Sequence, residues 1–165
     1  MHDFVAIPRP VAGALAGLTD VLGGDTGQLV AEAWEADAPI WASAGLDERD
    51  LHPARPIPVT ISGPRFRENG AVVHISWTTR GARLVPSVDC DLELASRGPV
   101  LSDLQLMGRY RFDEDPPRSA AESSLAHRAT VTAIRRLLDA MSREIQHHPG
   151  APSHARSAAS RSMRR

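Results

Sequence analysis

The sequence predicts an α+β protein in which an antiparallel sheet wraps around one long C-terminal helix, with two short helices near the N-terminus. From residue 57 to residue 112, apolar and polar side chains alternate with a period of two, which is typical of strands with one buried face. Residues 119–146 carry apolar side chains at helical spacing instead. Because the strand-like segments follow one another without helices between them, a parallel sheet of βαβ units is excluded.

The C-terminal helix is the only long, uninterrupted helical pattern in the chain. Ser119 and Glu122 have the spacing of a capping box at its start, behind Pro116 and Pro117, and Gly150 is expected to stop it. A lone amphipathic helix is marginal in water, so its apolar side is expected to lie on the sheet. The apolar positions of that side are Val131, Ile134, Leu137, Leu138, Met141 and Ile145.

The N-terminal segment predicts one strand and two short helices. Residues 3–7 form the apolar strand, and residues 11–22 carry leucines at helical spacing, although two glycines weaken that helix. Residues 25–34 form the second helix. Pro39 is expected to interrupt it and to leave residues 40–46 as a last turn.

The remaining strands follow in one run. Two prolines, Pro58 and Pro64, flank the first and indicate a sheet edge, and Asn69-Gly70 is a tight hairpin signal. Further strands are expected over residues 71–80, 84–94 and 100–112. Their inward positions are Val73, Ile75, Trp77, Val88, Cys90, Leu92, Leu94, Leu104, Leu106, Gly108, Tyr110 and Phe112.

Length and composition predict one domain, residues 1–146, and a disordered basic tail, residues 147–165. All 19 basic residues are arginines, which indicates the codon bias of a high-GC genome, such as an actinobacterial one. The first 148 residues carry fifteen arginines against all twenty acidic residues. A mildly acidic body has no electrostatic footprint for nucleic acid, so we expect no nucleic-acid partner.

The cysteine count and the lack of long apolar runs predict the cellular compartment. A single cysteine, Cys90, excludes an internal disulfide and fits a reducing compartment. No window approaches the roughly 18 apolar residues of a membrane span, and no charged start precedes a long apolar run. We therefore expect a cytoplasmic protein without a membrane span.

Three segments carry a family resemblance. The sequence LVPSVDCDLEL at residues 84–94, LMGRYR at residues 106–111 and HRAT at residues 127–130 are similar to segments of uncharacterised actinobacterial members of the SRPBCC superfamily. That superfamily includes START lipid-transfer domains, birch-pollen-allergen-like proteins and polyketide cyclases. The resemblance covers residues 3–146 and implies their helix-grip fold.

The resemblance also implies a cavity between the concave sheet face and the C-terminal helix, used in many relatives for apolar or amphipathic small molecules. The same side chains would equally form a solid core. The implied ligand-binding residues are Ile75, Trp77, Cys90, Leu92, Leu106, Tyr110, Ile134, Leu138 and Met141, with Val73, Val88 and Leu104 beside them.

Asp89, Asp91 and Cys90 are candidates for a metal site or a reactive thiol. Asp89 and Asp91 share one strand face and could bind a metal, but their alternation with apolar neighbours favours a solvated outer face. Arg109 and Arg111 lie on the matching face of the next strand and would balance them. The two aspartates would raise the thiol pKa of Cys90, so we expect an inert cysteine.

The histidines carry no recognisable catalytic arrangement. His127 and His74 have no identifiable nucleophile or orienting carboxylate, so packing or surface roles are favoured. The tail histidines His147, His148 and His154 lack a spacing that fixes metal geometry. Residues 23–27 are glycine-rich but lack the lysine and the preceding strand of a phosphate loop. We expect no catalytic residue, no metal site and no cofactor.

Three functional hypotheses remain. The first is non-enzymatic binding of an apolar or amphipathic small molecule between sheet and helix. The second is a cyclase- or hydrolase-like enzyme that uses the same cavity, with His127, Tyr110 or His74 as proton carriers. The third is a protein-interaction module with a filled core, which docks a partner at residues 57–66 or at the surface around Trp34 and Trp41. A homodimer would favour the third.

Overall fold

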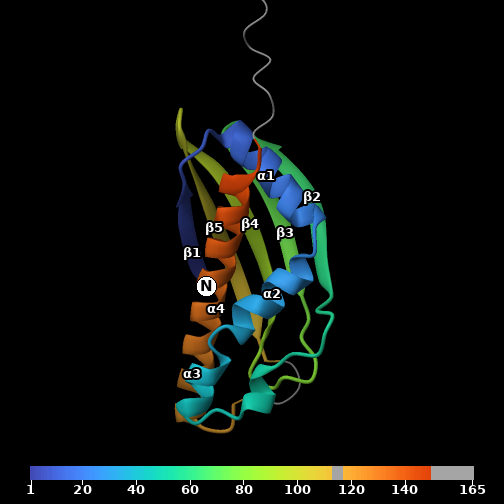
Figure 1. The fold of residues 1–165 in the computed structure, drawn as a ribbon, viewed down its shortest axis with the longest axis vertical. Coiled ribbons are helices and arrows are strands. Elements are labelled where there is room, and N and C mark those ends of the chain that lie inside the picture. Colours follow the sequence, from blue (N-terminus) through green and yellow to red (C-terminus); the bar gives the residue numbers. More distant parts are fainter. Residues whose placement is uncertain (113–116, 150–165) are drawn as a thin grey trace, which may run out of the picture.

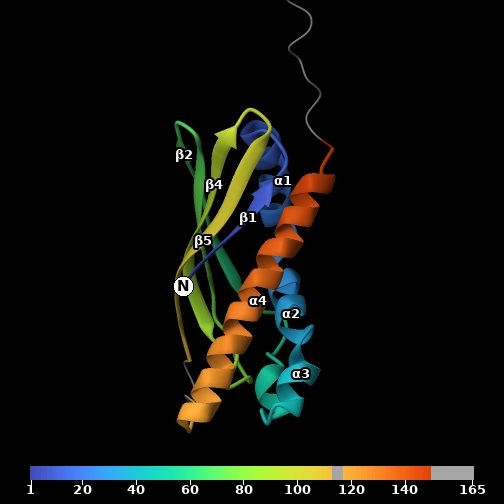
Figure 2. The ribbon, with the colours of Figure 1, turned by 90° about the vertical axis from the view of Figure 1, so that its left-hand side faces the viewer.

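The computed structural model describes residues 1–112 and 117–149. Five strands form one antiparallel sheet in the order β1-β5-β4-β3-β2, and the helices cover one of its faces (Figure 1, Figure 2). The predicted α+β class and the helix-grip arrangement are confirmed. The elements in chain order are β1 (His2–Ile7), α1 (Val11–Gly23), α2 (Thr26–Glu35), α3 (Ala38–Ser43), the 3-10 helix η1 (Glu48–Leu51), β2 (Val59–Arg67), β3 (Gly70–Trp77), β4 (Ser87–Gly98), β5 (Leu101–Arg111) and α4 (Ala120–His147).

The register of the sheet brings the predicted apolar positions onto one face. Ile75 pairs with Cys90 across β3 and β4, and Leu92 pairs with Leu106 across β4 and β5. The turn between β2 and β3 falls at the predicted Asn-Gly signal, since β3 begins at Gly70. Because side chains alternate between faces, these pairings place a continuous apolar layer under the helices.

β2 is an edge strand, as predicted, but Pro64 lies inside it instead of flanking it. The register of β2 against β3 shifts between Ser62 and Arg65, so Pro64 occupies a bulge. Proline has no N–H to offer to a ladder, and an irregularity in an edge strand accommodates that loss.

The strand predicted over residues 84–94 begins later, at Ser87. Backbone groups of Leu84 and Val85, at the start of the predicted strand, are already bonded elsewhere. The N–H of Leu84 donates to the carbonyl of Asp50 at 3.0 Å, and the hydroxyl of Thr79 donates to the carbonyl of Val85 at 2.5 Å. Leu84 and Val85 are buried all the same, which explains why their pattern resembles a strand.

Two helices cover the sheet side by side. α4 lies mainly over β1 and β5, whereas α1 contacts β3, β4 and β5 (Figure 2). The N-terminal region holds three short helices, not two, because Pro39 stands in the first turn of α3 and begins a helix there. A proline at that position needs no N–H partner. The helices in the described ranges include none that could cross a membrane.

The buried face of α4 differs from the predicted stripe at one position. Val131 is 46% exposed, whereas Ala129, Thr130 and Ala133 are buried. Small side chains in this part of the helix let it lie close to its neighbours. The rest of the stripe, from Ile134 to Ile145, is buried as predicted.

Side chains cap α4 at both ends. The Ser119 hydroxyl accepts from the N–H of Glu122 at 3.1 Å, as the capping box predicts. At the other end, one guanidinium nitrogen of Arg9 donates to the carbonyls of Ile145 and His148, each at 2.7 Å. A cation there satisfies the last carbonyls and complements the helix dipole.

The fold continues slightly beyond the predicted boundary at residue 146. α4 ends at His147, and the N–H of His148 still donates to the carbonyl of Glu144. Gly150, predicted as the stop, and the tail from residue 150 onward lie outside the described residues.

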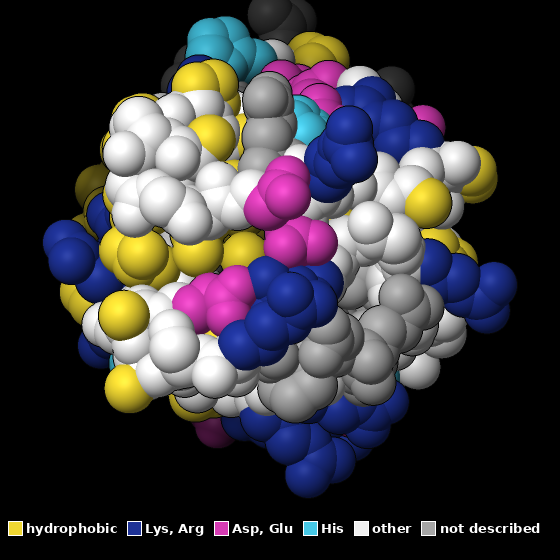
Figure 3. All heavy atoms as spheres, turned by 90° about the horizontal axis from the view of Figure 1, so that it is seen from below, with side chains coloured by type: hydrophobic (Ala, Val, Ile, Leu, Met, Phe, Trp, Pro, Cys, Tyr) yellow, Lys and Arg dark blue, Asp and Glu magenta, His cyan; other side chains and the backbone are white. Residues whose placement is uncertain are grey.

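A second, smaller apolar cluster closes the end of the molecule where α4 begins. It contains the buried side chains of Ala38, Leu46, Leu51, Leu84 and Ala126. Seen from this end, arginine and acidic side chains meet side by side near the centre (Figure 3).

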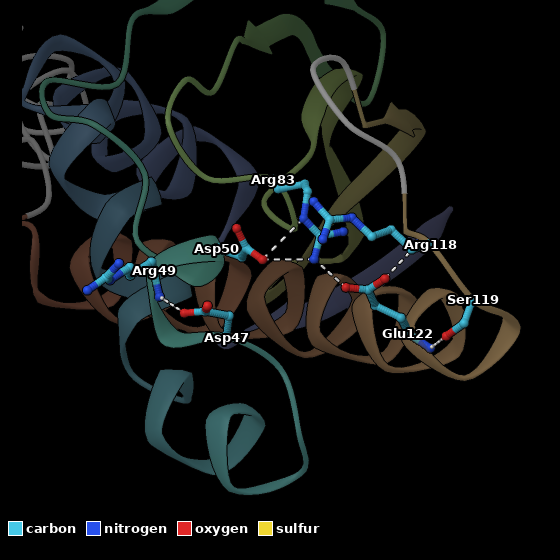
Figure 4. A network of polar contacts seen from close by, with 7 residues as sticks. All are labelled: Asp47, Arg49, Asp50, Arg83, Arg118, Ser119 and Glu122. Carbon is cyan, nitrogen blue, oxygen red and sulfur yellow. Dashed lines mark hydrogen bonds and ion pairs between the residues drawn. The ribbon is translucent and has the colours of Figure 1, made fainter.

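Arg83 joins three segments at this closed end. Its guanidinium donates to Asp50 of η1 at 2.8 and 3.1 Å and to Glu122 in the first turn of α4 (Figure 4). The carboxylate of Glu122 also accepts from the backbone N–H of Arg118. These bonds raise the pKa of Arg83 and hold the pKa of Glu122 below its ordinary value, mainly through the hydrogen bond between the two.

The contact between α1 and α4 gives the first prediction. A Cβ at Gly17 would lie 3.0 Å from the backbone of Ile145, whereas a Cβ at Gly13 would meet nothing within 4 Å. We expect Gly17→Ala to destabilise the protein by about 1–3 kcal/mol through overpacking. The matched control Gly13→Ala is expected to stabilise it by about 0.5–1 kcal/mol. Urea unfolding measures both, and equal stabilisation by the two would contradict the close contact.

The Arg83 contacts give a pH prediction. Because the pKa of Glu122 is lower in the folded state, its carboxylate stabilises the fold above the ordinary value of 4.5, and that contribution is lost as the pH falls through the lower folded value. Glu122→Gln is therefore expected to lower the melting temperature at pH 7 and to flatten its fall under acid. Glu68→Gln, in the exposed β2–β3 turn, serves as control. Parallel pH profiles for wild type and Glu122→Gln would contradict the prediction.

Candidate ligand site

The structure places the predicted lining in the space between the sheet and the helices. Eight of the nine residues are at most 3% exposed and belong to one packed cluster, and the ninth, Tyr110, is half-buried against it. The eight are Ile75, Trp77, Cys90, Leu92, Leu106, Ile134, Leu138 and Met141. The middle of the interior is therefore close-packed core, and open space lies toward its ends.

Cys90 lies in this packed middle. Its thiol donates to the carbonyl of Ile75 at 3.4 Å. Burial raises the pKa of the Cys90 thiol to about 12, and the charges of Asp89 and Asp91 add to that effect. The side chain is a small apolar group with no reactive thiolate near neutral pH.

A hollow of about 220 Å³ opens where β3 and β5 end and β4 begins, near the start of α4. We call it the strand-end hollow. Trp77 and Tyr110 of the predicted set line it, together with Val88. Outer-face residues also contribute, among them Asp89 and Arg109, whose nearest charged atoms lie 3.7 Å apart. Three lining residues stand at inward positions and the other six at the alternating outer positions, and none of them belongs to α4.

Two polar groups lie at this end of the interior. The indole N–H of Trp77 is buried and has no hydrogen-bond partner among the described residues. The Tyr110 hydroxyl contacts Nδ1 of His127, which projects from the second turn of α4, and the Tyr110 ring meets Phe112 edge-on at 5.8 Å. Burial raises the pKa of Tyr110.

The other candidate proton carriers lie at the surface. His127 is exposed apart from its contact with Tyr110. His74 lies on the outer face, with ring nitrogens 3.1 Å from Asp91 and 3.7 Å from Asp89. The predicted placement of the two aspartates on the outer face is correct, and His74 cannot reach a ligand on the inner face.

A larger hollow was not predicted. It measures about 540 Å³ and lies where α1, α2 and the end of α4 meet. Its wall contains a contact between a carboxylate oxygen of Asp20 and Nε2 of His148, at 2.5 Å. Its lining comes from three helices whose crossing cannot be deduced from periodicity. Across the part of the chain that the structure describes, no group of three His, Cys, Asp or Glu side chains could hold a metal ion.

The comparisons with known proteins add little to this geometry. No family model and no curated protein matches the chain. Among solved structures, the crystal structure of the Zhui aromatase/cyclase from Streptomyces sp. R1128 is similar, with 14% identity and a TM-score of 0.35, over 92% of this chain and 98% of that one. A structural similarity of this extent does not indicate what the chain binds.

Proposed function

We propose that the chain is a helix-grip protein of the SRPBCC type, of the actinobacterial group, that binds an apolar or amphipathic small molecule without catalysing a reaction. Its ligand binds at the strand-end hollow, at the end of the interior between the sheet and α4. The observation that carries the proposal is the indole N–H of Trp77, which is buried without a partner among the described residues and belongs to a residue that lines this hollow. The remaining predicted residues belong to the packed core and do not line the hollow.

An unpartnered buried donor has an energetic consequence. Removing an N–H from water without giving it an acceptor costs about 1–3 kcal/mol. A ligand with an oxygen acceptor beside Trp77 would recover that cost, while its apolar part rests against Val88 and the Tyr110 ring. This combination of an apolar wall with one or two polar groups is common in ligand pockets.

The size and charge of the hollow limit the ligand. Its volume of about 220 Å³ is smaller than the roughly 300 Å³ at which pockets for drug-sized ligands begin, so the ligand is small. Its charged lining residues are one acid, Asp89, and two arginines, Arg109 and Arg111, so they favour a neutral or acidic ligand over a basic one.

One observation favours the enzymatic alternative. The Tyr110 hydroxyl and the His127 imidazole are in contact at the rim, so a reacting ligand in the hollow would meet a pair of groups able to pass a proton. In that case Tyr110→Phe would abolish turnover and keep binding.

Another observation favours the interaction module. β2 lies at the edge of the sheet, where one side of the strand pairs with β3 and the other side has no neighbouring strand among the described residues. Its Phe66 is 70% exposed. Trp34, expected at a docking surface, is 5% exposed and belongs to the core instead, because it lies on the buried side of α2 with Val30 and Ala31. A homodimer through β2, measured by light scattering and lost in Phe66→Arg, would support this alternative.

The direct test begins with native mass spectrometry of the purified protein, which detects a molecule that comes off on denaturation. The affinity of the wild type and its variants is then measured for 2-naphthol, which has two fused aromatic rings and one hydroxyl oxygen that can accept a hydrogen bond. We expect Trp77→Phe to weaken its binding about three- to tenfold, the range for one hydrogen bond. Trp41→Phe, on α3, is the matched control. Equal affinity of all three proteins would refute the role of Trp77.

The reactivity of the single cysteine, Cys90, measures how accessible the middle of the interior is to a small reagent. A pKa near 12, against an ordinary value of 9.0, lowers the reactive thiolate fraction of Cys90 about 10³-fold near pH 8. We expect iodoacetamide to leave the native protein unmodified and to label the urea-unfolded protein rapidly, as measured by mass spectrometry. Rapid labelling of the native protein would show an open channel to Cys90.

A further inference from the structure

A groove runs between the α1–α2 turn and β2, away from the strand-end hollow. Two adjoining hollows form it, of about 170 and 330 Å³, and both are lined by Leu22 and Ile61. Figure 1 shows α1 and α2 meeting beside the β2 edge, where this groove lies. We call it the α1–β2 groove. It shares no lining residue with the strand-end hollow.

The smaller part of the groove is apolar. Leu15 and Leu18 of α1 line it on one side, and Pro64 and Val73 of the sheet line it on the other. A cavity of roughly 150 Å³ with walls of this kind is large enough for one benzene ring. The smaller hollow therefore has the size of a single aromatic ring or a short alkyl chain.

The larger part ends at the first turn of α2. Gly27 rests directly on the backbone of Ile57, since a Cβ there would lie only 2.5 Å from that carbonyl oxygen. This close approach buries Thr26, which is 4% exposed and lines the groove. The Thr26 hydroxyl has no hydrogen-bond partner among the described residues.

Thr26 differs in this respect from the other threonines in the described helices. The hydroxyls of Thr19, Thr130 and Thr132 each donate to the carbonyl four residues earlier, at 2.8–2.9 Å. Thr26 is the first residue of its helix, so no preceding turn supplies such a carbonyl. Its unpartnered hydroxyl is thus a consequence of its position, and the residue that carries it lines the larger hollow.

The charges of the lining residues limit which ligands the groove can bind. Asp25 is the only charged residue that lines the groove, and its carboxylate caps α2 by accepting from the N–H of Gln28 at 2.9 Å. A carboxylate beside the Thr26 hydroxyl repels anions and offsets the positive end of the helix dipole. No arginine lines the groove to pair with an acid. The lining therefore suits an uncharged molecule.

We infer that the α1–β2 groove is a second small-molecule site, separate from the proposed site at Trp77. Its ligand is an uncharged amphiphile with one aromatic ring or a short alkyl chain and a single hydroxyl. The apolar part lies between α1 and β2, and the hydroxyl bonds to that of Thr26.

Phenol and benzene are the probes, because they differ only in the hydroxyl. Titration of the full chain followed by two-dimensional amide NMR is expected to shift resonances of Leu22, Thr26 and Ile61. We expect Thr26→Val to lower the ratio of phenol affinity to benzene affinity about three- to tenfold. Thr132→Val, which also loses a helical hydroxyl, and Thr26→Ser, which keeps one, are expected to leave that ratio unchanged.

Three results would overturn the inference. The first is an unchanged affinity ratio in Thr26→Val. The second is phenol shifts confined to Trp77 and Tyr110, which would leave the proposed site as the only one. The third is the absence of saturable phenol binding to the wild type. Because Thr26→Val removes an unpartnered hydroxyl and keeps the shape of the side chain, it is expected to fold with unchanged or higher stability.

Discussion

Burial of one face of α4 is the constraint on which the rest of the structure depends. Arginine side chains bond this helix to other segments at three positions along its length, namely its end, its middle and its first turn. Arg9 binds its last carbonyls, Arg136 forks onto the buried Asp37 at 2.6 and 2.7 Å, and Arg83 binds Glu122 in its first turn. Each bond connects α4 to a segment distant in sequence. The apolar face supplies most of the stabilisation, and the charged contacts set the position of the helix.

This firm seating of α4 has a consequence for ligand binding. Side chains that are at most 3% exposed occupy the middle of the interior, so space for a ligand is left at its ends and along the edge by α1. Two residues that line such space, Trp77 and Thr26, carry a buried polar atom without a partner among the described residues. In a well-packed domain such atoms are rare, which gives them more weight than the size of a hollow alone.

The sequence predicted the fold better than the site. Alternation and helical spacing depend on local geometry, so the strands, the Asn-Gly turn and the long helix were recoverable. Misplaced boundaries, such as the start of β4, arose where backbone groups bond to a distant segment like η1. Trp77 was predicted to face inward, but its unpartnered N–H depends on side-chain packing. Thr26 carried no signal, because its burial follows from the contact between Gly27 and Ile57.

The two helices that cover the sheet have different freedom to move. α4 is bonded at both ends and along its length, whereas α1 has no side-chain cap at its start and touches α4 through Gly17. The Gly17 contact sets the distance of α1 from α4, and that distance sets the width of the groove on its other side. Arg9, which precedes α1, binds the end of α4, and Asp20 near the end of α1 contacts His148 just beyond α4. Only the last residues of α1 and the turn after them therefore depend on packing alone. Any widening of the groove is therefore expected at the Thr26 end, where the turn between α1 and α2 can shift without breaking a contact of α4.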